Sequence, residues 1–574
     1  MTPIPDLLHP EPRLWVAASE LRQVLTFAFA SGCGSDAFER ALEHTAPEPS
    51  RFAPDAFAKD LFIEDFVARC LVPRTGPKRN KPRREALVAL LTHPPDDLDT
   101  VAFRHNALAE LVANPAYREG LERVAQSLSE LFAQLEGTSR GKEAATTFRR
   151  IEILRSVRQT FDVIAEALPA AESGLARLTA FGQSVLASDA YRHLADVLDH
   201  EAHLATVDVR LRLARDGRIR SFDIMRTAEN TGNRFHVGPV GRFFSRLKLM
   251  LFGYRIREQE LIGRLLHNVF DGLEEALIAL FQVRRDVDFY LAALALSDLA
   301  KKRGLAVCLP TLSEPEAGTP LPPSRFVALY NPLLLLEERP PRPTDLVLGG
   351  SAELVVTGPN SGGKTRLLQA IGLAQLLAQA GFFVPAASAE LVVRDGLFVS
   401  VVEEATADAR EGRLGTELLR IRRLFERLAW GSLVIVDELC SGTNPSEAEE
   451  IFDLVLSQLA ELEPQTIVTT HFLHFAARLE AERPLSRLEF LQVELDENQT
   501  PTFGFVPGVA TTSLARRTAE RLGVTRDALR GLVDEARRDR GPRSHPRAST
   551  AGPTPHVTSS VTAVAAIDKP SRAS

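Results

Sequence analysis

The chain has 574 residues, of which 45% are hydrophobic and 25% charged, so it can bury several cores in roughly three or four domains. Its 68 Lys and Arg residues stand against 75 Asp and Glu residues, which gives a formal net charge of -7. This balance excludes a cationic field over the whole protein, so binding to nucleic acid or anionic lipid must be local.

The cysteines and the N-terminus bear on the compartment. Cys33, Cys70, Cys308 and Cys440 lie far apart, without the close pairing of a zinc site or a redox pair, and fit a reducing cytoplasm. The N-terminus lacks a cationic start with an apolar core, and no run of about 18 apolar residues occurs. We therefore expect a cytoplasmic protein with no signal peptide and no membrane span.

The first half of the chain is predicted to be mainly helical. Residues 1–84 form an N-terminal helical region with Pro-rich breaks, which ends in an exposed basic loop at 74–84. Residues 85–310 show helical periodicity to about 205 and again from 258 to 303, which predicts a helical core and lever domain. Between these stretches, alternation over 207–224 around Asp216-Gly217 predicts an inserted β-hairpin.

The second half is predicted to be an α/β domain. A Pro-rich connector precedes residues 325–535, in which short apolar strands alternate with helices. From 540 to 574 the sequence is rich in Ser, Thr, Pro, Arg and Ala and has no amphipathic period. Such a segment cannot bury enough apolar surface to offset its ordering entropy, so we predict a disordered tail.

A glycine-rich loop between a strand at 354–357 and a helix is the strongest motif. Its residue types and spacing match a phosphate-binding loop, whose glycines let successive backbone N–H groups face phosphates at a helix N-terminus. A lysine adds positive charge, and a threonine hydroxyl suits Mg²⁺. The candidate ATP-binding residues are Gly358, Pro359, Asn360, Ser361, Gly362, Gly363, Lys364 and Thr365.

Two further apolar strands end in polar groups. The strand from Leu433 ends in Asp437 and Glu438, which we assign to Mg²⁺ and to polarisation of the attacking water. The strand at 466–470 ends in His471, which could sense the γ-phosphate. Without the phosphate loop, Asp437 and Glu438 would equally suit capping of the strand end, and His471 would more often be a structural residue.

The helix start at Asn444 is assigned a structural role. Asn444 is predicted to be the N-cap, with Pro445 in the first turn and Glu447 three residues after the cap.

Together, TGPNSGGKT, DELCSGTNP and TTHF resemble the ATPase domain of the MutS family of DNA mismatch-repair proteins. The likeness includes Asn331-Pro332, Gly381 to Pro385 and 503–524, and thus covers about 330–535. A weaker likeness at 86–112 resembles the start of the family's helical core. The resemblance implies an ABC-type P-loop ATPase that uses ATP and Mg²⁺, forms a homodimer with composite sites and binds DNA.

The chain departs from the family pattern at two places. If Glu417 matches the family's acidic helix residue, Gly412 stands where the serine that acts on the partner's site is expected. The helical-core likeness begins near residue 86, so we expect no N-terminal mismatch-recognition domain. The preferred function is therefore an ATPase that moves helical arms around branched or damaged DNA.

Two other functions stay open. One is an RNA- or ribosome-linked ATPase of the same type, and the other is a nucleotide-gated protein scaffold with little hydrolysis.

The basic loop and a second basic stretch at 242–257 could contact phosphates, although both would equally suit solvated loop faces.

Overall fold

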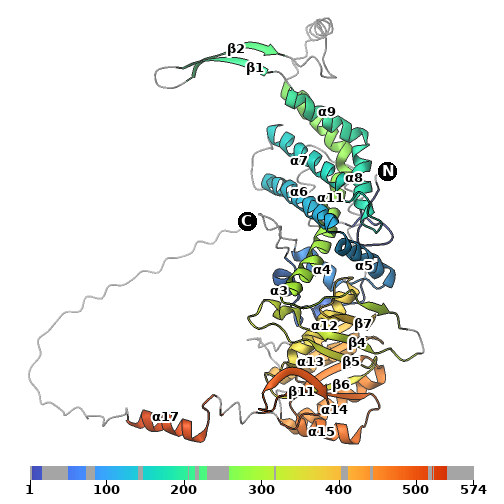
Figure 1. The fold of residues 1–574 in the computed structure, drawn as a ribbon, viewed down its shortest axis with the longest axis vertical. Helices are drawn as coiled ribbons and strands as arrows, with labels where there is room; N and C mark the ends of the chain where they lie inside the picture. The colour runs from blue at the N-terminus through green and yellow to red at the C-terminus, as the bar shows by residue number, and fades with distance from the viewer. Residues whose placement is uncertain are drawn as a thin grey trace, which may run out of the picture. The chain divides into compact units, whose positions relative to one another are not determined.

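A computed structural model describes residues 3–15, 50–72, 84–139, 147–203, 206–213, 219–228, 258–315, 319–401, 412–439, 444–512, 514, 520 and 522–538 (Figure 1). The chain divides into two compact units, Met1–Ser513 and Leu514–Ser574, and each is described by itself. The predicted basic loop at 74–84, except Arg84, the stretch at 242–257 and the predicted disordered tail lie outside the described residues.

The first unit begins with helices, as the periodicity predicts. These are η1 (Pro54–Ala56), α3 (Ile63–Cys70), α4 (Arg84–Thr92), α5 (Leu98–Ala113), α6 (Pro115–Ser139), α7 (Thr147–Glu166), α8 (Ala176–Leu186), α9 (Asp189–His203) and the 45-residue α11 (Glu258–Lys302). Helix α11 contacts α6, α7 and α9 along its length. The helical prediction for 85–205 and 258–303 is thereby confirmed, and the division into domains stays a prediction.

The predicted hairpin is also confirmed. Strands β1 (Thr206–Leu213) and β2 (Ile219–Ala228) pair antiparallel, from Thr206 opposite Ala228 to Leu213 opposite Ile219. The turn residues Asp216-Gly217 lie between the strands, outside the described residues.

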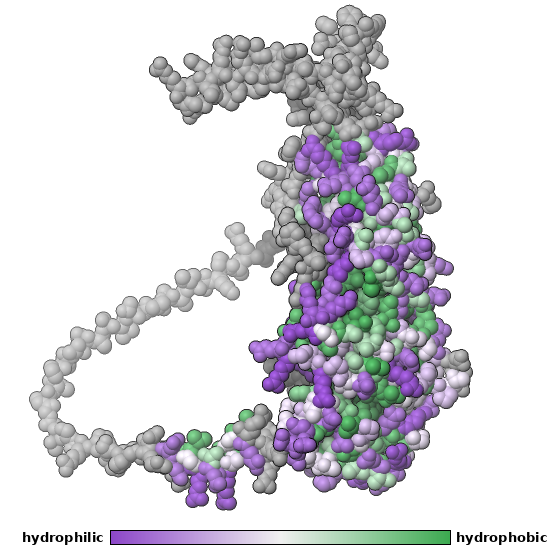
Figure 2. Space-filling view, viewed as in Figure 1, coloured by the Kyte–Doolittle hydropathy of each residue, from purple (hydrophilic) through white to green (hydrophobic). Residues whose placement is uncertain are grey.

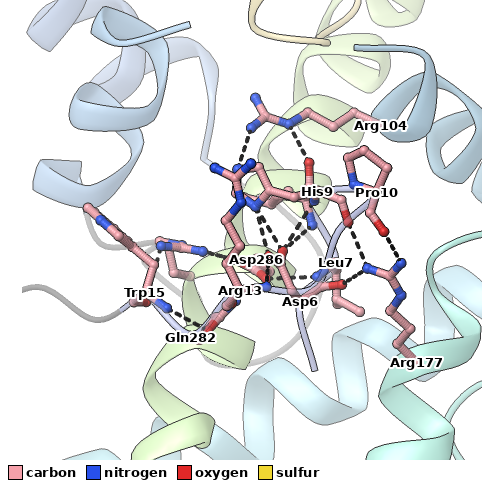
Figure 3. A network of polar contacts seen from close by, with 12 residues as sticks. Asp6, Leu7, His9, Pro10, Arg13, Trp15, Arg104, Arg177, Gln282 and Asp286 are labelled. Atoms are coloured by element: carbon pink, nitrogen blue, oxygen red, sulfur yellow. Dashed lines mark hydrogen bonds and ion pairs between the residues drawn. The ribbon is translucent and has the colours of Figure 1, made fainter. Parts of the chain in front are cut away.

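The N-terminal segment, residues 3–15, contains no helix and lies against α11 (Figure 3). The backbone N–H of Leu7 donates to Asp286 Oδ2 at 3.0 Å, and that of Trp15 donates to Gln282 Oε1 at 3.0 Å. The Tyr290 hydroxyl donates to Leu7 O at 2.5 Å. Side chains of α11 thus bind the backbone of a segment that lies more than 260 residues away in the sequence.

A six-stranded sheet forms the centre of the α/β part. Its order is β12-β11-β6-β10-β9-β8, in which β12 is antiparallel to β11 and the other pairings are parallel. The strands are β6 (Glu353–Thr357), β8 (Leu397–Ser400), β9 (Leu433–Val436), β10 (Gln465–Thr470), β11 (Leu488–Leu495) and β12 (Pro501–Pro507).

Helices cover both faces of this sheet. Alternate residues of β6 face opposite sides of the sheet. Leu354 and Val356 belong to an apolar cluster that includes α12 (Lys364–Gln379), and Val355 belongs to a second cluster that includes α13 to α15. These helices are α13 (Gly412–Arg427), α14 (Pro445–Leu462) and α15 (Leu473–Glu482). Burial on both faces explains the continuous apolar strands of the sequence.

A second sheet lies in the same unit. Its strands are β3 (Thr311–Ser313), β4 (Ser324–Leu329), β5 (Thr344–Leu348) and β7 (Ser388–Val392), in the order β3-β7-β4-β5, and η2 (Pro332–Leu336) follows β4. One buried apolar cluster continues from the helices α5 to α8 and α11 into α12 and the large sheet. The helical part, which comprises α3 to α9 and α11, thus shares one core with α12, the helix that follows the phosphate loop, and α4 contacts α12.

The second unit contains the described helix α17 (Arg526–Arg538), on which Leu529, Leu532 and Val533 are exposed.

Polar and apolar residues are interspersed over the described face in Figure 2. Among the described helices, none is both long and apolar enough to cross a membrane.

Candidate functional site

The loop between β6 and α12 turns tightly, and several of its residues have the positive φ angles that such a turn requires. Gly358 and Gly363 have φ of +139° and +94°, and Ser361 has φ of +64°. A Cβ atom on Gly358 would lie 2.6 Å from Val493 Cγ2 on β11, so glycine is required there by space and by φ. Helix α12 begins at Lys364, directly after the loop.

Lys364 is buried at the start of α12. Its side chain is 5% exposed, and Nζ donates to Gly358 O at 2.9 Å and to Pro359 O at 3.2 Å. Burial lowers the pKa of Lys364, and the charges of Glu438 and Asp437 partly oppose this. Lys364 forms no ion pair with any residue that the structure describes.

The acidic end of β9 lies beside Thr365. Asp437 follows the last residue of the strand, and its Oδ2 accepts a hydrogen bond of 2.5 Å from Thr365 Oγ1. Its Oδ1 accepts a hydrogen bond from Thr469 Oγ1 on β10. The structure thus brings Thr365 and Asp437, the two predicted metal ligands, into contact.

Glu438 has a left-handed backbone, with φ of +50°. Its N–H donates to Thr469 Oγ1 at 2.8 Å, whereas the preceding N–H, of Asp437, donates to Ser400 O at 2.8 Å and continues the ladder toward β8. The chain therefore turns out of the sheet at Glu438. A non-glycine residue in this conformation needs surrounding contacts to hold it there.

His471 follows β10, next to the strands that carry the loop and the carboxylates, as predicted. Its side chain is exposed, and its ring lies 4.2 Å from that of Phe472, measured between centroids. His471 does not belong to the described residues that line the pocket at the phosphate loop. A catalytic role for His471 stays a prediction.

A pocket of about 600 Å³ opens over the phosphate loop. One part of its lining is polar and includes Glu438 and the loop from Asn360 to Thr365. Another part is apolar or aromatic and includes Leu329, Tyr330, Leu334, Pro340, Pro341, Phe503 and Phe505. The pocket thus combines the polar and charged groups of the loop with an apolar wall, which suits a flat, apolar group.

Asn331, which precedes the loop and belongs to the motif shared with the MutS family, contacts helix α12. Asn331 Nδ2 donates to Arg366 O at 3.0 Å and lies 3.3 Å from Gln369 Oε1, so it ties the start of η2 to the first turn of α12. The N-cap prediction for α14 is confirmed, because Asn444 Oδ1 accepts from Ser446 N. Gly412 is the first residue of α13, and residues 402–411 before it lie outside the described residues.

Thr469 and the apolar wall were not among the predicted site residues. Thr469 is one of several buried threonines at strand ends, and only the sheet order brings it to Asp437. Phe503 lies on β12, 140 residues after Gly363, and an added Cβ on Gly363 would meet its ring at 3.4 Å. No local pattern in the sequence indicates either contact.

The chain is similar to known proteins over part of its length. Residues 354–531 match the family model of MutS domain V. The Endonuclease MutS2 of Thermomicrobium roseum is 32% identical over 279 residues, which cover 48% of this chain and 34% of that protein. The Endonuclease MutS2 proteins of Gemmatimonas aurantiaca and Thermus thermophilus are 31% and 30% identical, over 52% and 50% of this chain.

The matched stretches cover only part of the length of each relative. The matched stretches span only 34%, 36% and 37% of the lengths of these three proteins, which is about a third. In this chain the stretches cover about half of its length.

Proposed function

The chain belongs to the MutS family through its MutS domain V, and we propose that it is a Mg²⁺-dependent ATPase that couples nucleotide state to DNA binding. The observation that carries the proposal is the buried ammonium of Lys364, which lies in a phosphate-type loop and forms no ion pair with the described residues. A buried cation is costly unless an anion accompanies it, and a polyphosphate supplies that anion.

The residues of the pocket fit a nucleotide with its metal. The N–H groups of the loop from Asn360 to Gly363 and the charge of Lys364 would hold the phosphates, and Thr365 with Asp437 would hold Mg²⁺. When bound, Mg²⁺ would, together with the ammonium of Lys364, neutralise the negative charge of the γ-phosphoryl group. The apolar wall with Tyr330 and Phe503 fits the flat base.

Glu438 is the proposed general base. Its side chain lines the pocket beside the loop, and its carboxylate would accept a proton from the water that attacks the γ-phosphoryl group. His471, which follows the neighbouring strand, is proposed as the group that responds to that phosphoryl group.

The DNA-binding part of the proposal, and the homodimer that we add to it, rest on the match to MutS domain V. Each phosphate loop would be completed by the partner's α13 region, in which Gly412 replaces the expected serine. A composite site makes ATP a clamp between two subunits, because a ligand that binds both subunits stabilises their association. Branched or damaged DNA is the proposed substrate.

The first test changes Lys364 and Glu438. Lys364→Ala should abolish ATP binding, because it removes the charge that holds the phosphates. Glu438→Gln should bind ATP, release phosphate at least ~100-fold more slowly and accumulate as a dimer, because only the proton acceptor is lost. Phosphate release, nucleotide binding and sedimentation velocity measure these outcomes.

Lys301→Ala is the matched control, since Lys301 is an exposed lysine near the end of α11. It should behave as the wild type. Turnover at the wild-type rate in Glu438→Gln would rule out Glu438 as the base, and a wild type that releases no phosphate would rule out the ATPase itself.

The choice of nucleic acid needs a separate experiment. Binding of branched, mismatched and single-stranded DNA, structured RNA and ribosomes is measured with and without ATP, over a range of salt concentrations. The proposal expects ATP-dependent affinity for branched DNA to exceed that for RNA. Preference for RNA or ribosomes would favour the RNA-linked alternative.

A further inference from the structure

One hydroxyl group connects the two acidic residues of the site. Thr469 is fully buried at the end of β10, and its Oγ1 contacts Asp437 Oδ1 and lies 2.8 Å from the backbone N of Glu438. Strands β10 and β9 are parallel neighbours, and their register pairs Val468 with Val436. The next residues of the two strands, Thr469 and Asp437, are therefore adjacent.

The chemistry of these groups fixes the direction of both hydrogen bonds. The N–H of Glu438 can only donate, so Thr469 Oγ1 accepts there, and its one hydroxyl hydrogen is donated to the carboxylate of Asp437. The other oxygen of Asp437 accepts from Thr365 Oγ1. Both oxygens of Asp437 are thus held by hydroxyl groups from two different elements.

The same contact bears on Glu438. The left-handed φ of +50° at Glu438 is uncommon for a residue with a side chain. Its N–H points to Thr469 instead of continuing the ladder that Asp437 makes with Ser400. The hydroxyl of Thr469 therefore holds the turn that directs Glu438 to the pocket.

We infer that Thr469 is a positioning residue, which orients Asp437 toward Mg²⁺ and fixes the backbone turn that presents Glu438. This inference rests on the proposed function of the same site. Thr469 touches neither nucleotide nor metal in this role and acts through the two acidic residues. Partners of metal-binding carboxylates characteristically affect metal affinity or activity by about 10- to 100-fold.

The test removes the hydroxyl and keeps the shape of the side chain. At saturating Mg²⁺, Thr469→Val should lower kcat for ATP by about 10- to 100-fold with KM within about threefold of the wild type. It should also reduce the gain in affinity that Mg²⁺ gives for a fluorescent ADP analogue, and leave Mg²⁺-free affinity unchanged. Thr469→Ser restores the hydroxyl and should recover both properties.

A matched control lies on the same strand. Thr466 is also buried on β10, and its hydroxyl has no hydrogen-bond partner among the described residues. Thr466→Val therefore makes the same chemical change away from the site and should leave both readouts as in the wild type. Thr469→Ala is a second hydroxyl-free variant, and Mg²⁺-free ADP binding shows that each variant has folded.

The outcomes separate the inference from the proposed function. If Thr469→Val or Thr469→Ala keeps the wild-type response to Mg²⁺, or if Thr469→Ser is as impaired as Thr469→Val, the positioning role is wrong. A wild type that binds ADP with Mg²⁺ but hydrolyses no ATP overturns the ATPase proposal. In that case the Mg²⁺ response still tests Thr469.

Discussion

Asp286 is a fully buried carboxylate on α11 that accepts a hydrogen bond from Arg285 Nε at 2.9 Å. It also accepts one from the backbone N–H of Leu7 in the N-terminal segment at 3.0 Å (Figure 3). Burial raises its pKa to about 6, although the charge of Arg285 opposes the rise, and the nearby carboxylate of Asp6 adds to it. For Asp6, burial favours a higher pKa, but the hydrogen bond and charge of His9 outweigh it and lower the pKa.

The raised pKa of Asp286 predicts how its contribution to the free energy of unfolding depends on pH. Between its ordinary pKa of 3.8 and about 6, the folded chain keeps a proton that the unfolded chain has lost. The contribution of Asp286 to stability is therefore full below 3.8 and is lost as the pH rises through about 6. The free-energy advantage of the wild type over Asp286→Asn should fall by on the order of 2 kcal/mol between about pH 4 and pH 7.

Urea unfolding of both proteins across this pH range measures the difference. Asp298→Asn controls for loss of a carboxylate from the same helix, since Asp298 pairs with Arg118 in a partly exposed position. A wild-type advantage that rises with pH would contradict the sign of the effect.

At the residue scale, the sequence predicts side chains that stand at the ends of local patterns. Lys364 and Thr365 follow a glycine-rich loop, and Asp437 ends an apolar strand, so each can be recognised from its neighbours in the chain. Thr469 cannot, because its importance comes from a contact across 32 residues of sequence. Asp286 cannot either, since its partner Leu7 lies 279 residues away.

At the element scale, helix α12 connects the phosphate loop to the helical part. Its C-terminal carbonyl, Ala380 O, accepts from Arg104 Nη1 at 2.9 Å, and Arg104 Nε donates to Leu8 O at 3.0 Å. Arg104 is fully buried on α5 and lies over the ring of Phe289. One guanidinium thus binds the end of α12 and the N-terminal segment, and its charge suits the negative end of the helix dipole.

Replacement of Arg104 should loosen both elements. Arg104→Met leaves the carbonyls of Leu8 and Ala380 without this donor and should lower the free energy of unfolding by about 2–4 kcal/mol. Hydrogen exchange should become faster in residues 3–15 and at the end of α12. Unfolding by urea and exchange followed by mass spectrometry test these effects.

Arg118→Met is the matched control, because Arg118 pairs with Asp298 in a partly exposed position. Arg118 also pairs with Glu122, but solvent screens these partly exposed contacts, so this change should cost less than Arg104→Met, on the order of 1 kcal/mol. Equal costs for Arg104→Met and Arg118→Met would contradict the bridging role of Arg104.

The type of most elements was predictable because their periodicity is local. Helix α11 begins and ends within one residue of the stretch 258–303 that the sequence predicts, and the hairpin strands flank the Asp216-Gly217 signal. The order β12-β11-β6-β10-β9-β8 was not predicted, since neighbours such as β6 and β10 are more than 100 residues apart. Their pairing depends on packing on both faces of the sheet, which no local pattern records.

At the scale of the whole molecule, net charge constrains how DNA could be bound. With a net charge of -7, the protein as a whole repels a polyanion, so attraction must come from a basic surface that is small relative to the chain. Binding of this kind is strongly salt-dependent.

The proposed coupling between ATP and DNA can be tested by its reciprocity. If ATP changes the affinity for branched DNA by some factor, DNA must change the affinity for ATP by the same factor. A coupling of about 1–3 kcal/mol corresponds to a change of roughly 5- to 150-fold. Glu438→Gln is the suitable protein for this measurement, because slow hydrolysis keeps the nucleotide constant, and Lys364→Ala should show no coupling. Both affinities are measured at one salt concentration, and an ATP affinity that saturating DNA leaves unchanged would exclude the coupling.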